Sequence, residues 1–113
     1  ARAGLSKATV ITPPVDGFFA HVFFREPKGK DGVAEVTLKN PRLGIGVRLE
    51  YELENLPVLV QWKSMRSGDY ALGIEPSNSF LTGRPNERAN GTLKRIGAGQ
   101  SLTFRLRLEC YDL

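Results

Sequence analysis

Alternation of apolar and polar residues is the feature of this sequence that most constrains its fold. Three segments alternate with a period of two, at residues 33–40, 46–53 and 101–110. Because successive side chains of a strand point to opposite faces, each segment would have one buried face and one face in water. Such strands are typical of antiparallel sheets that are covered on one side. We therefore expect an all-β chain.

The spacing of turns refines this expectation. Shorter β-rich segments lie at 17–25, 58–62 and 70–75, and clusters of Gly, Pro, Asn and Asp separate the strands at intervals of about ten residues. This pattern predicts an antiparallel β-sandwich. The length of 113 residues fits one domain. We treat residues 1–113 as a single β domain whose first 11 residues form a flexible or edge segment.

Composition excludes several classes of protein. The chain has one cysteine, Cys110, and one histidine, His21, so a disulfide framework, a Cys/His zinc cluster and a mechanism that needs two histidines are all excluded. It contains no apolar run of the roughly 20 residues that span a membrane and no signal-like stretch at its start. We expect a cytoplasmic protein that needs no metal or cofactor and has no membrane partner.

The net charge of +4 raises the question of nucleic-acid binding. The 16 Lys and Arg residues are scattered among 12 acidic residues, however, and no run of five basic residues occurs. A solvated strand face explains such a distribution equally well. We expect no nucleic-acid partner.

One carboxylate is placed where chemistry could occur. Glu75 follows an apolar strand and directly precedes Pro76 and the long connection 76–91. Functional groups are often presented on such loops by a rigid scaffold. If apolar neighbours desolvated Glu75, its pKa would rise toward the value of a general base that works near neutrality. The alternative is a strand-end glutamate that is solvated or paired with Arg84 or Arg88.

Other side chains allow two interpretations each. Trp62 could stack on the apolar face of a sugar ring or belong to the core of a sandwich. Arg84 could bind sugar hydroxyls or phosphate, or lie in water. His21 stands among phenylalanines and is best interpreted as a packed histidine, and Cys110 as a small core residue.

Taken together and in this order, several motifs resemble the C-terminal part of aldose 1-epimerase (galactose mutarotase)-like proteins, and more closely an uncharacterised branch of that superfamily. The most specific motif is Leu-Gly-Ile-Glu-Pro-Ser-Asn at 72–78, and the weaker ones are Trp-Lys at 62–63, Gly-Arg at 83–84 and Gly-Ala-Gly-Gln-Ser at 97–101. The resemblance covers about residues 10–112. It implies that the sandwich is the C-terminal portion of a β-supersandwich with a sugar site across one face.

The resemblance also implies an activity. Members interconvert the α and β anomers of aldoses without metal or cofactor: a glutamate takes the proton of the anomeric hydroxyl, and a histidine protonates the ring oxygen. By motif position Glu75 matches the catalytic glutamate. The substrate, a monosaccharide or sugar phosphate, would be bound by Trp62, Lys63, Asn78 and Arg84, with Lys63 as an alternative phosphate ligand.

The chain departs from the family pattern at the acid. That histidine lies well over a hundred residues before the glutamate, whereas 74 residues precede Glu75 here, and His21 is too close to be its equivalent. We expect a C-terminal portion of a longer protein, inactive alone.

Half a supersandwich would expose apolar sheet surface and strand edges, so association with copies of itself or with the rest of a parent chain is also expected. Two other functions stay open: a non-catalytic carbohydrate-binding β-sandwich module, and a β-sandwich that binds another protein.

Overall fold

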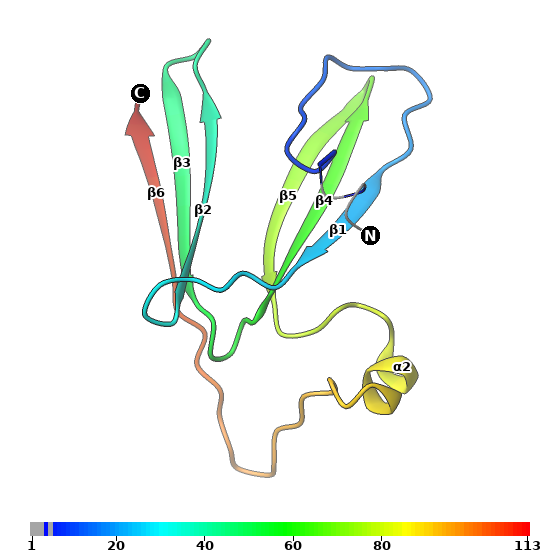
Figure 1. The fold of residues 1–113 in the computed structure, drawn as a ribbon, viewed down its shortest axis with the longest axis vertical. Coiled ribbons are helices and arrows are strands. Elements are labelled where there is room, and N and C mark those ends of the chain that lie inside the picture. The colour runs from blue at the N-terminus through cyan, green and yellow to red at the C-terminus, as the bar shows by residue number, and fades with distance from the viewer. Residues whose placement is uncertain (1–3, 5) are drawn as a thin grey trace.

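The computed structural model describes residues 4 and 6–113, and Figure 1 shows their fold. The described residues form six strands and a short helix, in the order β1 (His21–Arg25), β2 (Val33–Asn40), β3 (Ile45–Glu52), β4 (Val58–Arg66), β5 (Asp69–Ser77), α2 (Arg84–Ala89) and β6 (Leu106–Asp112). The expectation of an all-β fold is confirmed.

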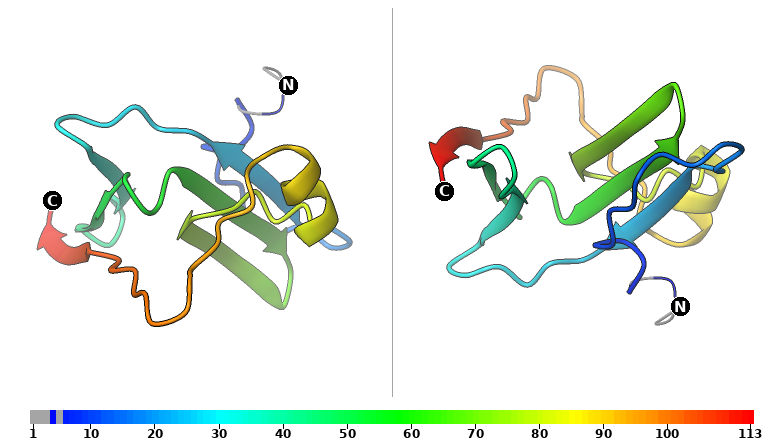
Figure 2. Two further views of the ribbon diagram at one scale, coloured as in Figure 1. Left: turned by 90° about the horizontal axis from the view of Figure 1, so that it is seen from below. Right: turned by 90° about the horizontal axis from the view of Figure 1, so that it is seen from above.

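The strands form two antiparallel three-stranded sheets. One has the order β1-β4-β5 and the other β2-β3-β6. Figure 1 shows them standing side by side, and the end-on views of Figure 2 show the long connection 78–105 running from one to the other. The arrangement is consistent with the expected sandwich. The larger supersandwich remains a prediction.

The alternating segments became strands where a neighbouring strand was available. Segment 33–40 is β2, and segment 46–53 is β3 shifted by one residue. The prediction of a strand over residues 101–110 was right only for its second half, because β6 begins at Leu106. Its partner β3 ends at Glu52, whose backbone N–H donates to the carbonyl oxygen of Arg105 at 3.3 Å. Beyond that bond, residues 101–104 have no strand of the described chain to pair with.

The long connection after β5 contains a helix that the sequence pattern did not indicate. Helix α2 is six residues long and has Pro85 in its first turn, where the missing N–H costs no hydrogen bond. A helix this short shows too little periodicity to be recognised. In residues 4 and 6–113 no helix has the length and apolar character needed to cross a membrane.

The core lies between the two sheets. Ala34 of β2 and Tyr51 of β3 pack against Leu59 of β4 and Leu56 of the preceding turn, and all four are buried. The radius of gyration is 16.2 Å, whereas a compact domain of this length would have about 13 Å. The sheets therefore meet over only part of their apolar faces.

The described part of the predicted N-terminal segment packs against β4. Ala8 is fully buried, and its carbonyl oxygen accepts a hydrogen bond of 2.6 Å from the side chain of Gln61. The ammonium group of Lys63 donates to the carbonyl oxygens of Lys7 and of Val10, the latter at 2.9 Å. These bonds hold the segment on the side of the β1-β4-β5 sheet that faces the other sheet.

Candidate functional site

Trp62 and Glu75 lie on the same face of the β1-β4-β5 sheet. The register sets Trp62 of β4 opposite Gly73 of β5, and Val60 opposite Glu75 two residues further along. Side chains two residues apart point to the same side, so Trp62 and Glu75 are diagonal neighbours. Leu59, which packs in the core, belongs to the other face. We call the side that carries Trp62 and Glu75 the outer face.

A glycine gives the carboxylate its place on this face. A Cβ atom at Gly73 would collide with Oε1 of Glu75 and would lie 3.4 Å from Cβ of Trp62. The side chain of Glu75 therefore folds back over Gly73 toward the tryptophan. Glu75 is exposed and Trp62 is half-buried. The desolvation considered for Glu75 is thus not seen, but its carboxylate and part of the indole are both accessible.

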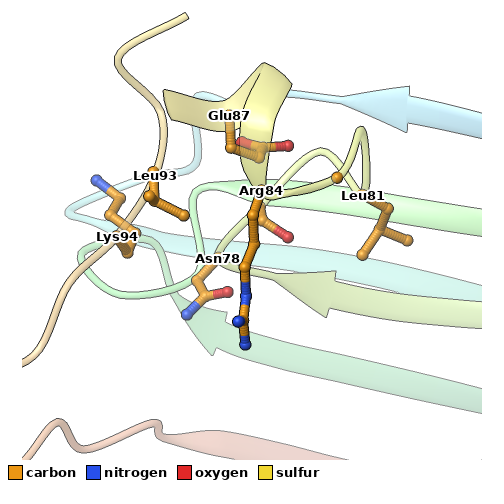
Figure 3. Close-up of a pocket in the computed structure, with 8 residues that line it drawn as sticks. Asn78, Leu81, Arg84, Glu87, Leu93 and Lys94 are labelled. Carbon is orange, nitrogen blue, oxygen red and sulfur yellow. The ribbon is translucent and has the colours of Figure 1, made fainter. Parts of the chain in front are cut away.

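Asn78 and Arg84 line an open hollow just beyond the end of β5 (Figure 3). The hollow has a volume of about 400 Å³, which is within the range of small-molecule sites. The loop that forms it folds over the outer face, because the ring of Phe80 lies 6.2 Å from that of Phe24, which shares a row with Glu75. Asn78 follows Glu75 by three residues, about 10 Å along an extended chain.

Two cationic side chains border this hollow, those of Arg84 and Lys94. Neither forms an ion pair with a residue of the described chain. In Figure 3 the side chain of Arg84 extends beside that of Asn78, whereas Lys94 comes from the strand-free segment on the other side. The hollow therefore offers positive charge and hydrogen-bond donors to a ligand.

Glu87 of α2 organises the walls of the hollow. It is buried, and its carboxylate accepts hydrogen bonds from the backbone N–H groups of Phe80 at 3.1 Å and Thr82 at 3.3 Å, from the Thr82 hydroxyl at 2.8 Å and from the Thr92 hydroxyl. The Thr92 and Thr82 hydroxyls hold the pKa of Glu87 below its usual value. Sequence reasoning missed Glu87, since no local motif predicts that these four donors, from three residues, converge on its carboxylate.

Lys63 lies on the opposite face from Trp62 and Glu75. It is buried, and its ammonium group donates to the two backbone carbonyls of the N-terminal segment described above. Desolvation, and then the nearby charge of Lys7, lower the pKa of Lys63. The structure gives Lys63 a structural role and separates it from Trp62 and Glu75, which lie on the outer face.

His21 lies on the same face of the sheet as Lys63, because the two residues pair across β1 and β4. Its ring packs against Phe18 and Phe23 at centroid distances of 5.3 and 6.0 Å. The ring therefore contacts phenylalanines as expected, but His21 is exposed and not packed in a core, and it lies on the opposite side of the sheet from Glu75. In the described residues no group of three His, Cys, Asp or Glu side chains could hold a metal ion.

Comparison with known proteins identifies the family. The model of a family described as a domain of unknown function, DUF4432, matches residues 1–110. The chain is a member of the DUF4432 family. No curated protein and no solved structure matches it. Membership in an uncharacterised family agrees with the coarser part of the resemblance, while the link of DUF4432 to aldose 1-epimerases is a proposal.

Proposed function

We propose that this DUF4432 chain binds a monosaccharide or sugar phosphate on the outer face of the β1-β4-β5 sheet, as the base-bearing portion of an aldose 1-epimerase-like protein. The observation that carries the proposal is the juxtaposition of an accessible carboxylate and an indole. Glu75 lies over Gly73 and beside Trp62, where only a residue without a side chain leaves it room.

The two groups suit the two kinds of surface on a pyranose. The apolar C–H face of the ring packs on the exposed part of Trp62, and Glu75 accepts hydrogen bonds from hydroxyls at the ring edge. Asn78 lies about 10 Å further along the chain, and Arg84 borders the same hollow as Asn78. This spacing favours a ligand longer than a free sugar, in which a phosphate reaches Arg84 and Lys94 while the anomeric end lies at Glu75.

The reaction proposed for Glu75 is proton abstraction. The carboxylate takes the proton of the anomeric hydroxyl, the oxygen–hydrogen electron pair becomes the second bond of a C1 carbonyl, and the bond from C1 to the ring oxygen breaks as that oxygen takes a proton from an acid. Rotation about C1–C2 and the reverse steps give the other anomer. Such base catalysis contributes about 10²–10⁴-fold.

The described residues of the outer face do not supply the acid that would protonate the ring oxygen. The neighbours of Glu75 on the outer face are Val60, Trp62, Gly73 and Ser77, and none of them titrates near neutrality. We therefore expect the chain alone to bind sugar and to accelerate mutarotation little. Activity would need an acid from outside the described residues.

The test uses the single tryptophan of the chain as its reporter. Titration with glucose, galactose and their 6-phosphates should change the fluorescence of Trp62 in a saturable way. Glu75→Gln should keep this change and should abolish any mutarotation that polarimetry detects in the chain or in a longer protein that contains it. Glu54→Gln, an exposed carboxylate in the turn before β4, is the matched control. Absence of a saturable response to every sugar would refute the proposal.

A second function is favoured by the exposure of Glu75 and by the lack, among the described residues, of an acid beside it on the sheet. In that case the chain is a carbohydrate-binding module without catalysis. The same titration would then show binding, while polarimetry on a longer protein with intact Glu75 would show no acceleration of anomer exchange.

A further inference from the structure

We propose that two copies of this chain associate by antiparallel pairing of their β6 strands about a two-fold axis at Leu108. The pairing would join two β2-β3-β6 sheets into one continuous sheet. This proposal is independent of the proposed sugar site, which lies on the other sheet.

The first observation is a free strand edge. In the described chain β6 pairs with β3 on one side and with no strand on the other, and Figure 1 shows it on the side of its sheet that points away from the β1-β4-β5 sheet. A row of unpaired backbone groups is a ready template for another strand. Symmetric pairing of identical edges is the simplest way to cover it, because two-fold dimers are closed.

The backbone of β6 shows which residues face that edge. Arg105 accepts a hydrogen bond from the N–H of Glu52 at 3.3 Å, and the N–H of Leu113 donates to the carbonyl oxygen of Gly44 at 2.9 Å. Odd-numbered residues of β6 thus direct their backbone groups toward β3. By alternation the even-numbered residues direct theirs outward, so Leu108 can exchange two hydrogen bonds with Leu108 of a second copy.

The side chains of these residues are apolar and exposed. Leu108 is 68% exposed, and Leu106 and Cys110 are exposed on the same face, so the interpretation of Cys110 as a core residue was wrong. The whole chain has 8437 Å² of accessible surface, whereas a compact monomer of 12.5 kDa has about 6,200 Å². The surplus of about 2,200 Å² is spread over the whole chain, so it shows that the chain has uncovered surface, of which the exposed side chains of β6 are a part.

Charge selects the register. Pairing centred on Leu108 sets Arg107 opposite Glu109 of the second copy, and Leu106 opposite Cys110. A shift of the centre to residue 107 would set two arginines face to face, and a shift to 109 would set two glutamates face to face. Like charges directly opposite destabilise a sheet, so the centre at Leu108 is favoured.

The same register extends a pattern that already exists inside the chain. Glu109 forms an ion pair with Arg48 of β3 at 3.1 Å, and Arg107 forms one with Glu50 at 3.6 Å. In the dimer one row would run Arg48, Glu109, then Arg107 and Glu50 of the second copy. The signs alternate throughout, so each inner charge has an opposite charge on both sides.

Cross-linking tests the register. In Leu106→Cys the new thiol would face the native Cys110 of the second copy, whereas residues 106 and 110 of one strand are about 13 Å apart and cannot bond. Mild oxidation should give a covalent dimer whose 106–110 linkage mass spectrometry identifies. Leu38→Cys is the control: it is exposed on the same sheet face, but on the opposite edge strand β2. A dimer that links as readily through position 38 would overturn the proposal.

A charge-reversal substitution tests the same contact between β6 strands without a cross-linking reaction. Sedimentation of the unmodified chain should show twice the mass of 12.5 kDa. Arg107→Glu should raise the dimer Kd at least about tenfold, since two like-charge pairs replace two opposite-charge pairs. Arg105→Glu is the matched control for Arg107→Glu. It also loses one exposed ion pair, with Glu52 at 3.1 Å. Residue 105 would face Tyr111 of the second copy, however, so this variant would place no like charges opposite each other across the axis.

Three results would refute the proposal. These are a monomer at about 100 μM, a concentration at which a standard interface is occupied; equal effects of Arg105→Glu and Arg107→Glu; and a linkage in the oxidised Leu106→Cys protein other than 106–110. If Arg107→Glu failed to fold, the linkage found in Leu106→Cys would decide.

Discussion

Truncation of Leu59 tests whether the contact between the two sheets holds this fold together. Leu59 is 7% exposed and packs with Ala34, Tyr51 and Leu56 in the core. Leu59→Ala deletes three carbon atoms, which at about 0.8 kcal/mol each corresponds to about 2.4 kcal/mol of transfer free energy. The cavity left behind would add to this cost, and such substitutions range over about 2–5 kcal/mol.

The surroundings of Leu59 place the expected loss at the lower end of that range. An open hollow of about 370 Å³ already borders Leu59 between the sheets, with Val36 and Ile74 on its walls. Because these neighbours have room to relax, little additional cavity should remain. We expect a loss of about 2.5–3 kcal/mol in the free energy of unfolding, and a fall of more than about 10 °C in Tm for a domain of this size.

Urea denaturation followed by circular dichroism would measure this loss. Leu43→Ala is the matched control, because it deletes the same atoms from a side chain that is 65% exposed in the turn between β2 and β3. It should change the unfolding free energy by less than about 0.5 kcal/mol. Equal losses for the two variants would show that the core between the sheets does not stabilise the fold, and the reasoning would fail.

Three further predictions concern the site and the core. Gly73→Ala should displace the carboxylate of Glu75 and weaken the sugar-induced change in Trp62 fluorescence, with the urea midpoint as a control for folding. Because the folded-state pKa of Glu87 is lowered, the stability advantage of the native protein over Glu87→Gln should be full above pH 4.5 and shrink as the pH falls through that lowered pKa; a pH-independent difference in urea titrations would contradict this. The hydroxyl of Tyr51 is buried without a hydrogen-bond partner in the described chain, so Tyr51→Phe should leave the unfolding free energy unchanged or raise it by about 1 kcal/mol, and a loss of more than that amount would refute the inference.

Local alternation was sufficient to predict much of the fold. In β2 and β3 every second side chain is apolar, and the structure turns Ala34 and Tyr51 into the core. The same rule, applied to two adjacent residues, separates Trp62 from Lys63, since neighbours in a strand point to opposite faces. The sequence alone was therefore sufficient to predict that Lys63 and Trp62 point to opposite faces of β4.

Contacts between distant residues were decided by tertiary structure. Nothing local indicates that six strands divide into β1-β4-β5 and β2-β3-β6, because sheet order depends on which edges meet after collapse. The burial of Glu87 by groups five to seven residues away, and the exposure of Glu75, likewise follow from how the loop after β5 folds. The sequence by itself determined strand identity and the two faces of each strand, which are properties of a few consecutive residues. Only the tertiary structure decided which faces are covered, because burial depends on partners far away along the chain.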